Sequence, residues 1–335
     1  MDHQKYFEKI LFFAFLAVVS VIPVRAQEPD DVIRTETSLV QLNIGVVDKQ
    51  GRAITSLTRN DFAIYEDGVK QSIQHFEPVE APFSLVLMLD MSGSTVNFRQ
   101  QLKLASQRFL DALAPEDRVA VIQFNKDVKS LSGFSTDRRK TAYAIEIASG
   151  AGETHFYEAL KYSLKELEKE GQRRKAIVVL TDGLDTRLRN TDRATLSKAQ
   201  TDEEALAAIQ PHTSTDLNSV LNSADRLGVT IYPLALPSGD PKRLPLQTPN
   251  IVGIYAAARA RLQSLADRTG GRLNEINRLE YMAQLYREVA ASLRTLYTVA
   301  YQAKGDRLRG KWHEIKVEVA NTDLTARTKP GYYAR

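Results

Sequence analysis

Two carboxylates and three hydroxyls in this sequence stand next to predicted strands and helices in a way that would bring their oxygens together. They are Asp90, Ser92, Ser94, Thr154 and Asp182. Asp90 and Asp182 each end an apolar run, and Thr154 directly precedes a segment with helical periodicity. Hard divalent cations such as Mg²⁺ prefer oxygen ligands and keep several waters, so they need few direct carboxylates. These residue types therefore suggest the binding of a metal ion.

The segments that would position these residues alternate between predicted strands and helices. Short, continuous apolar runs occur at 83–89, 118–124, 175–180 and 229–236. Such runs are typical of strands covered on both faces, as in parallel sheets. Segments with apolar residues at helical spacing separate the runs. This order predicts a doubly wound, mostly parallel α/β sheet, and in such sheets ligands bind beyond the carboxyl ends of the strands.

Each candidate ligand also has an ordinary structural explanation. Serine and aspartate before a helix are common N-caps, and the Asp-x-Ser-x-Ser stretch taken alone favours capping. Thr154 could cap the helix that begins near His155, and Asp182 with the glycine after it could be a simple turn. We interpret the set as a metal site because its three pieces occur, in order, at the strand ends of one predicted sheet.

The segments on either side of the α/β region predict a second, smaller domain. Residues 37–80 and 296–335 contain short β-type runs, and Asp67-Gly68 is a favoured hairpin turn. The simplest arrangement pairs the two segments into one small β-sandwich, with the α/β domain at 83–295 inserted between them. Two separate β appendages are the alternative.

Residues 1–26 have the pattern of a secretory signal peptide. Basic residues precede a short apolar run, and small residues precede the predicted cut after Ala26. An uncleaved membrane anchor is the alternative. Residues 27–36 would then form a linker, and no later segment is apolar enough to span a bilayer. We expect a secreted or periplasmic protein whose mature chain has no membrane span.

The composition excludes several kinds of site and partner. The 335 residues include no cysteine, which rules out disulfides, thiolate metal sites and cysteine nucleophiles. The formal net charge is only +4, and no block of lysines and arginines occurs, so nucleic-acid binding has little support. A hydrophobic content of 43% and a charged content of 26% are typical of an ordinary globular protein.

The order Asp-x-Ser-x-Ser, then Thr before a helix, then Thr-Asp-Gly after a strand, resembles the metal-ion-dependent adhesion site of von Willebrand factor A-type domains. The resemblance spans about 83–295 and includes "LGVTIYPLAL" and "LADRTGGRL". The flanking segments "DFAIYEDGVKQSIQHF" and "LYTVAYQ…GYYAR" resemble a secreted bacterial, acidobacterial-type group of proteins related to von Willebrand factor A.

The resemblance also implies a role for each residue of the site. Ser92 and Ser94 would bind Mg²⁺ through their hydroxyls, and Thr154 would join them in the ligand-competent state. Asp90 and Asp182 would act largely through bound water. Mn²⁺ or Ca²⁺ could take the place of Mg²⁺. One position of the metal would stay open for an Asp or Glu carboxylate of a partner protein.

Two features set this chain apart from the usual family pattern. Glu153 and His155 flank Thr154, where small residues are common; we expect His155 to start the helix, because Mg²⁺ sites favour oxygen. The polar segments at 183–214 and 237–253 are expected to be long loops at the metal edge of the sheet. Long loops are usually functional or disordered. We expect these two to shape partner specificity, with disordered decoration as the alternative.

The function that this sequence favours is an exported, divalent-cation-dependent protein-binding module, not an enzyme. A structural part of a cell-envelope assembly, with the metal bracing its loops, is the first alternative. A metal-assisted hydrolase is the second, and the motifs argue against it. Position 92 is Ser where a phosphoaspartate enzyme would carry a second Asp. The sequence also has no Gly-x-Ser-x-Gly elbow, His-Glu-x-x-His or phosphate loop.

Overall fold

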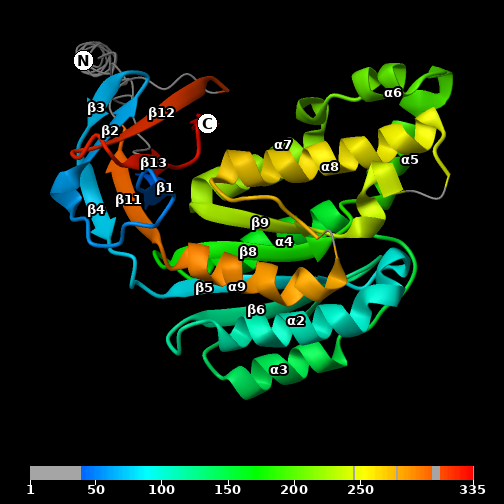
Figure 1. Cartoon of the computed structure of the whole chain (residues 1–335), viewed down its shortest axis with the longest axis horizontal. Helices are drawn as coiled ribbons and strands as arrows, with labels where there is room; N and C mark the ends of the chain where they lie inside the picture. The colour runs from blue at the N-terminus through cyan, green and yellow to red at the C-terminus, as the bar shows by residue number, and fades with distance from the viewer. Residues whose placement is uncertain (1–38, 244–245, 277, 304–309, 335) are drawn as a thin grey trace, which may run out of the picture. The chain divides into compact units, whose positions relative to one another are not determined.

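The computed structural model describes residues 39–243, 246–276, 278–303 and 310–334. Figure 1 shows the arrangement of their strands and helices. The predicted signal peptide and linker, residues 1–36, lie outside the described residues. Within the described part of the chain, no helix is both long enough and apolar enough to cross a membrane.

A six-stranded sheet forms the centre of the α/β region, and its strand order is β10-β9-β8-β5-β6-β7. All neighbours are parallel except β6 and β7. Every residue of β5, β8 and β9 is buried, as continuous apolar runs predict. The strands are β5 (Phe83–Asp90), β6 (Arg118–Phe124), β7 (Val128–Ser135), β8 (Arg174–Thr181), β9 (Val229–Ala235) and β10 (Asn274–Glu275).

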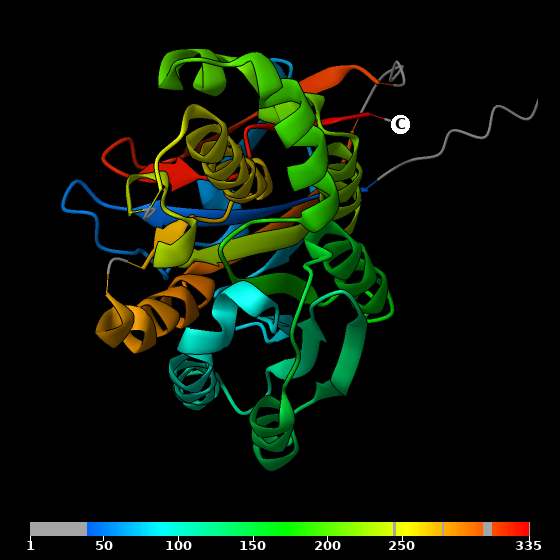
Figure 2. The ribbon, with the colours of Figure 1, turned by 90° about the vertical axis from the view of Figure 1, so that its right-hand side faces the viewer.

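Helices cover both faces of this sheet, which Figure 2 shows from its end. One face packs against α2 (Arg99–Asp111), α3 (Arg138–Ile147) and α9 (Met282–Leu293). The other packs against α4 (Phe156–Glu168), α7 (Thr215–Leu227) and α8 (Pro249–Thr269). Successive side chains of β5 alternate between the two apolar clusters, because neighbouring residues of a strand point to opposite faces. The predicted doubly wound fold is confirmed.

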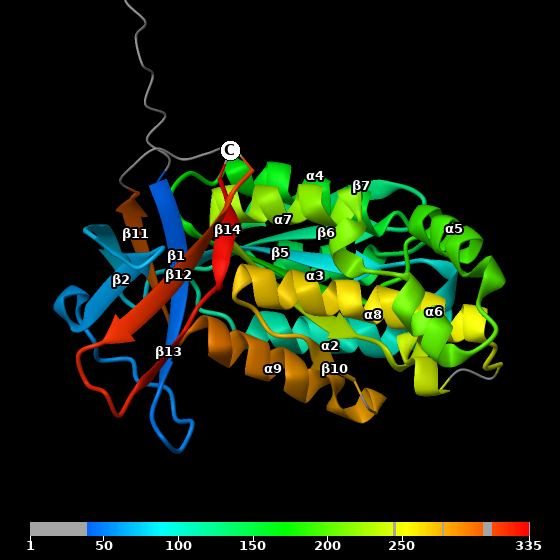
Figure 3. The same ribbon diagram turned by 90° about the horizontal axis from the view of Figure 1, so that it is seen from above.

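The two flanks of the chain form two four-stranded sheets around a shared apolar core. One sheet has the order β13-β1-β11-β4 and the other β14-β12-β2-β3, so each combines strands from both ends of the chain (Figure 3). The strands are β1 (Leu39–Val47), β2 (Phe62–Glu66), β3 (Val69–Gln71), β4 (Ile73–Glu77), β11 (Leu296–Gln302), β12 (Trp312–Val319), β13 (Thr325–Arg327) and β14 (Gly331–Tyr333). The predicted β-sandwich is confirmed.

The hairpin turn that the sequence predicts at Asp67-Gly68 is present in the sandwich. Asp67 and Gly68 form the hairpin turn between β2 and β3 with φ values of 48° and 78°, the left-handed geometry that a two-residue turn requires. The end of the described chain forms two short strands, β13 and β14. Pro330 separates them, since proline has no N–H to donate to a sheet.

Arg174, the first residue of β8, holds the junction between the sandwich and the central sheet. Its side chain is fully buried, and its guanidinium lies 4.0 Å from the ring centre of Phe83. Burial lowers the pKa of Arg174 to about 10. The guanidinium donates hydrogen bonds to backbone carbonyls in both segments that connect the sandwich to the α/β region. These carbonyls belong to Val79 and Ala81 before β5, to Leu293 at the end of α9 and to Leu296 at the start of β11. One arginine therefore fastens the entrance and the exit of the inserted domain.

The expectation of a long loop at 183–214 is wrong, because this segment is largely helical. It contains α5 (Thr186–Thr195) and α6 (Asp202–Ala208). A buried ion pair fixes α5 to α8: Nη1 and Nη2 of Arg261 donate to the two carboxylate oxygens of Asp192, at 2.6 and 2.7 Å. The second segment, 237–253, begins with two short 3₁₀ turns and then enters α8. The segment at 183–214 is therefore neither a long polar loop nor disordered.

Candidate metal centre

The candidate ligands come together at the carboxyl edge of the central sheet, at the ends of β5 and β8. Backbone hydrogen bonds tie their loops to each other. Gly93 N donates to Gly152 O at 2.9 Å, which joins the loop after β5 to the loop before α4. Gly150 lies so close to the first loop that a Cβ there would stand 2.8 Å from Met91 O. Only glycine permits this approach, and it brings Thr154 towards the two serines.

Asp90 is fully buried, and it joins the two strand ends through its carboxylate. Its Oδ1 accepts a hydrogen bond from Ser92 N at 3.0 Å. Its Oδ2 accepts one from Thr181 Oγ1, the last residue of β8, at 2.7 Å. Both oxygens are thus held in place, which orients the carboxylate beside Asp182.

The hydroxyls of Ser92 and Ser94 point to the same place and do not cap the helix behind them. Ser92 is the N-cap residue of the 3₁₀ turn η2 (Gly93–Phe98), yet its side chain makes no capping hydrogen bond. Its Oγ lies 3.1 Å from Ser94 Oγ. Thr95 holds the loop instead, donating from Oγ1 to Asp90 O at 2.8 Å. Capping therefore does not explain Ser92, whose hydroxyl faces that of Ser94 instead.

Asp182 follows β8 and is 1% exposed. Its Oδ1 accepts a hydrogen bond from Leu184 N at 3.1 Å. Its Oδ2 is buried and has no hydrogen-bond partner among the described residues. A buried carboxylate oxygen without a partner is costly, so a bound ligand or cation at this point would be stabilising.

Thr154 is buried and is fixed by a reciprocal backbone bond with the start of α5. Its N–H donates to Thr186 Oγ1 at 3.0 Å, and its carbonyl accepts from Thr186 N at 2.9 Å. The N-cap residue of α4 is His155, as expected, so Thr154 does not cap that helix. The ring nitrogens of His155 lie 3.7 Å or more from the neighbouring carboxylates of Glu153 and Glu158.

Residues 85–184 match the family of von Willebrand factor type A domains. The chain contains a von Willebrand factor type A (VWA) domain. Domains of this family generally mediate metal-dependent protein interactions and are mostly not enzymes. The matched residues include Asp90 at the end of β5, Thr154 in the loop before α4, and Asp182 directly after β8.

Solved structures similar to this chain include several VWA domains. A von Willebrand factor type A protein from Catenulispora acidiphila is 12% identical, with 90% of this chain and 76% of that one covered and a TM-score of 0.47. The vWF domain of the pili tip protein Mfa5 from Porphyromonas gingivalis is 14% identical, with 68% and 98% covered and a TM-score of 0.47. A mussel byssus matrix protein with a zinc-occupied MIDAS motif is 14% identical, with 68% and 49% covered and a TM-score of 0.44. No curated protein sequence matches this chain significantly.

Sequence reasoning missed two residues that hold the VWA site together. Thr181 fixes Asp90, and its Oγ1 also accepts a hydrogen bond from Gly183 N at 3.0 Å. Asp185 caps α5 through the N–H groups of Arg187 and Leu188, and its Oδ2 accepts from Tyr157 N at 3.3 Å. Thr181 is the first residue of the Thr-Asp-Gly stretch, and Asp185 lies two residues after that stretch, so their place in the motif was the available signal.

The two carboxylates of the VWA site share a buried, low-dielectric environment. Burial, followed by the charge of Asp182, raises the pKa of Asp90 to about 7. Burial also raises the pKa of Asp182, while the nearby Ser94 hydroxyl and the Arg259 guanidinium oppose this rise. Two adjacent buried carboxylates with raised pKa values are a strong electrostatic reason for a cation to bind between them.

The donor set fits a hard divalent cation, since it consists of oxygen atoms alone. Among the described residues, no group of three or more His, Cys, Asp or Glu side chains could hold a metal. Metal binding at this edge would therefore need the hydroxyls as well as the two carboxylates. Asp182 Oδ2, which has no partner among the described residues, is the atom whose environment a cation would complete.

Proposed function

We propose that this protein is an exported module that binds a partner protein through a divalent cation held in its VWA domain. Ser92, Ser94 and Thr154 would bind the metal through their hydroxyls. Asp90 and Asp182 would act largely through bound water. Mg²⁺ suits this all-oxygen set best, and Mn²⁺ and Ca²⁺ are the alternatives.

The observation that carries this proposal is the incomplete hydrogen bonding of Asp182 close to serine hydroxyls that do not cap a helix. Buried polar atoms are nearly always paired in folded proteins. Here a buried carboxylate oxygen has no partner in the described part of the chain, while the Ser92 side chain makes no cap. A cation would satisfy both, which supports a binding site over a purely structural turn.

The class of partner follows from the charge and preference of the bound metal. A divalent cation bound mainly through neutral hydroxyls is only partly neutralised, and it prefers oxygen ligands. The group that suits it best is an Asp or Glu carboxylate of another protein. Such recognition works by charge and geometry, and it breaks no covalent bond.

The proposals on domain organisation and export rest on sequence patterns. Residues 1–26 would be removed as a signal peptide, and residues 27–36 would form a linker that precedes the fold. The VWA domain would extend over 83–295, between the sandwich segments at 37–80 and 296–335. A mature chain of this kind would act outside the cytoplasm, where proteins without disulfides depend on their packed cores.

Calorimetric titration of the purified protein with MgCl₂ tests this function, together with retention of proteins from an envelope extract with and without EDTA. Ser94→Ala should weaken Mg²⁺ binding at least tenfold, because it removes a ligand without touching the core; Ser94 is exposed. Ser130→Ala, which changes an exposed serine on β7, is the matched control and should bind like wild type. Equal Mg²⁺ affinity in both variants, or retention that EDTA leaves unchanged, would refute the proposal.

A further inference from the structure

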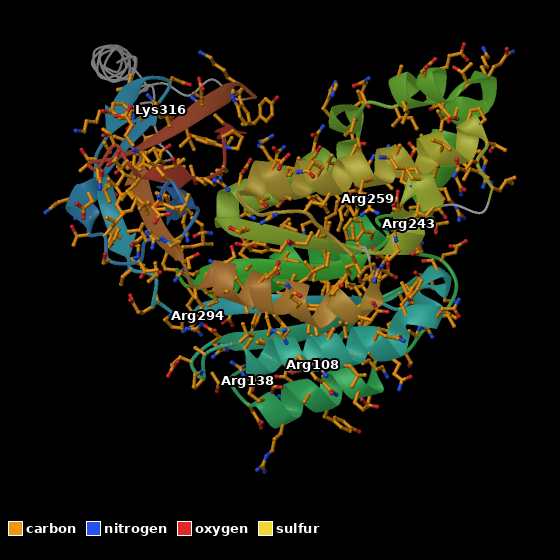
Figure 4. The ribbon with its side chains drawn as sticks, in the orientation of Figure 1. Arg108, Arg138, Arg243, Arg259, Arg294 and Lys316 are labelled. Carbon is orange, nitrogen blue, oxygen red and sulfur yellow. The ribbon has the colours of Figure 1, made fainter. Side chains whose placement is uncertain are left out.

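Arg259 on α8 is a partly buried cation near the candidate metal centre. Figure 4 labels it among the side chains of the VWA domain. Its side chain is 15% exposed, and its Nη1 is buried with no hydrogen-bond partner among the described residues. An arginine next to a cation site is unexpected, because like charges repel. Its position therefore calls for an explanation beyond packing.

A chain of close contacts connects Arg259 to Asp182. Arg259 Nη2 donates to Leu236 O at 3.2 Å, and Gly239 N donates to the same oxygen at 3.1 Å. Gly239 touches Asp182 so closely that a Cβ there would stand 2.4 Å from Asp182 O. On the other side, a Cβ at Gly183 would lie 3.4 Å from the carbonyl of Ala258, the residue before Arg259.

The acidic groups around Arg259 show where its charge acts. Glu275 Oε1 lies 3.8 Å from its Nε, at the outer limit of an ion pair. Asp240 and Asp182 also interact with it, and Asp240 already pairs with Arg243 Nε at 3.1 Å. Asp182 is the buried member of this group: burial raises its pKa, and the Arg259 guanidinium opposes that rise. The contacts through Leu236 and Gly239 therefore place the positive charge of Arg259 next to the candidate metal centre.

We infer that Arg259 is the built-in counter-cation of the metal centre: it stabilises the carboxylates while no metal is bound and lowers the affinity of the centre for a divalent cation. This inference rests on the proposed function. A metal must bind against the repulsion of the guanidinium, so the loaded centre keeps a more positive potential. That potential favours an anionic group of the partner at the open position of the metal.

The charge of Arg259 matters more here than its hydrogen bond. Leu236 O keeps the hydrogen bond from Gly239 N when the arginine is removed, and Leu236 N still donates to Thr181 O at 2.9 Å. The turn against Asp182 therefore stays in place. Removing the guanidinium then acts mainly through electrostatics, and a weaker repulsion means tighter metal binding.

Calorimetric titration with MgCl₂ at pH 8 of wild type, Arg259→Gln and Arg259→Lys tests the inference. Arg259→Gln removes the charge and should tighten Mg²⁺ binding about tenfold. Arg259→Lys keeps the charge and should stay within about twofold of wild type. The control is Arg272→Gln, which removes the same charge from an exposed residue beyond the far end of α8 and should change nothing. Far-UV circular dichroism in EDTA checks that each variant is folded.

The outcomes separate this inference from the proposed function. Wild-type protein that binds no Mg²⁺, Mn²⁺ or Ca²⁺ refutes the function, and the inference falls with it. Wild-type binding with an Arg259→Gln affinity that is equal or weaker refutes only the inference. An Arg259→Lys variant that tightens as much as Arg259→Gln would also refute it, because the retained charge would then have no effect.

Discussion

Both edges of the central sheet bury an aspartate, but the hydrogen bonding of its carboxylate is complete at one edge and incomplete at the other. At the amino edge, Asp117 is 3% exposed and both its oxygens are paired. Oδ1 accepts from Phe83 N, and Oδ2 accepts from Ala114 N and Arg294 Nη2, each at 2.9 Å. At the carboxyl edge, Asp182 has one N–H partner for Oδ1, and Oδ2 has none in the described part of the chain.

This difference shows which aspartate serves the fold and which serves a ligand. A buried carboxylate with complete hydrogen bonding and a cation contributes to stability and is costly to disrupt. One left incomplete costs stability, so its persistence indicates a binding role. Asp117 should therefore matter for unfolding and Asp182 for metal binding, and substitutions can separate the two roles.

Asp117→Ala should have the largest effect on the free energy of unfolding. It leaves the buried N–H groups of Phe83 and Ala114 without an acceptor and removes the partner of Arg294, which costs about 3 kcal/mol. Urea denaturation measures the loss. The increase in Tm on adding Mg²⁺ should remain that of wild type, and its disappearance would mean that the two edges are not independent.

Asp182→Asn should show the opposite pattern. Without metal, the free energy of unfolding should stay within about 1 kcal/mol of wild type, because the substitution removes a poorly satisfied buried charge. Stabilisation by Mg²⁺ should vanish, a loss of about 2.7 kcal/mol when the metal is present at about 100 times the wild-type Kd. Denaturation with and without MgCl₂ checks both. A metal-free loss as large as that of Asp117→Ala would contradict the comparison.

Metal binding should strengthen with pH between 6 and 8. The pKa of Asp90 is raised to about 7 in the metal-free protein, so below pH 7 a proton must leave before the cation can bind. The apparent Kd for Mg²⁺ should rise up to about tenfold for each pH unit below 7 and level off above pH 8. Titration calorimetry at pH 6, 7 and 8 measures this; a Kd independent of pH would argue against a protonated Asp90.

The same raised pKa has an opposite consequence for the metal-free fold. The pKa of Asp90 is higher in the folded chain than the unfolded value of 3.8, so the folded state holds the proton more tightly between about pH 4 and 7. The contribution of Asp90 to stability is thus fully present at low pH and is lost as the pH rises through 7. Added Mg²⁺ should restore stability most at the alkaline end of this range.

Thr154→Val should give the smallest effect, and one confined to the metal. The substitution keeps the volume and removes the hydroxyl, while the backbone bonds to Thr186 remain. We expect the Kd for Mg²⁺ to rise several-fold and the metal-free Tm to move by less than about 2 °C. Thr154→Ser is the control, since it keeps the hydroxyl. A Tm loss shared by both variants would point to a structural role.

The sequence was sufficient for the parts that depend on local pattern. Continuous apolar runs mark β5 and β8, and the aspartates that end them reach the same edge because parallel strands share their carboxyl ends. The helix α5 could not be foreseen, since it buries only Thr186 and Asp192 and has no apolar stripe. A tertiary ion pair to Arg261 holds it instead.

Arginines that are wholly or partly buried were the other part that the sequence could not reveal. Arginine is usually exposed, so Arg174 and Arg259 look like surface residues in the sequence. Their burial depends on backbone carbonyls that come from distant segments: Leu293 and Leu296 for the first, and Leu236 for the second. Such contacts exist only once the fold has formed, so the spacing of residues in the sequence does not predict them.

Anomalous X-ray diffraction from crystals grown with MnCl₂ tests the central claim most directly. The account predicts one Mn²⁺ peak at the carboxyl edge of the sheet, with the hydroxyls of Ser92 and Ser94 as direct ligands and Asp182 close enough to bind through water. A metal-loaded crystal with no peak at this edge, or with Mn²⁺ bound only elsewhere on the protein, would contradict it.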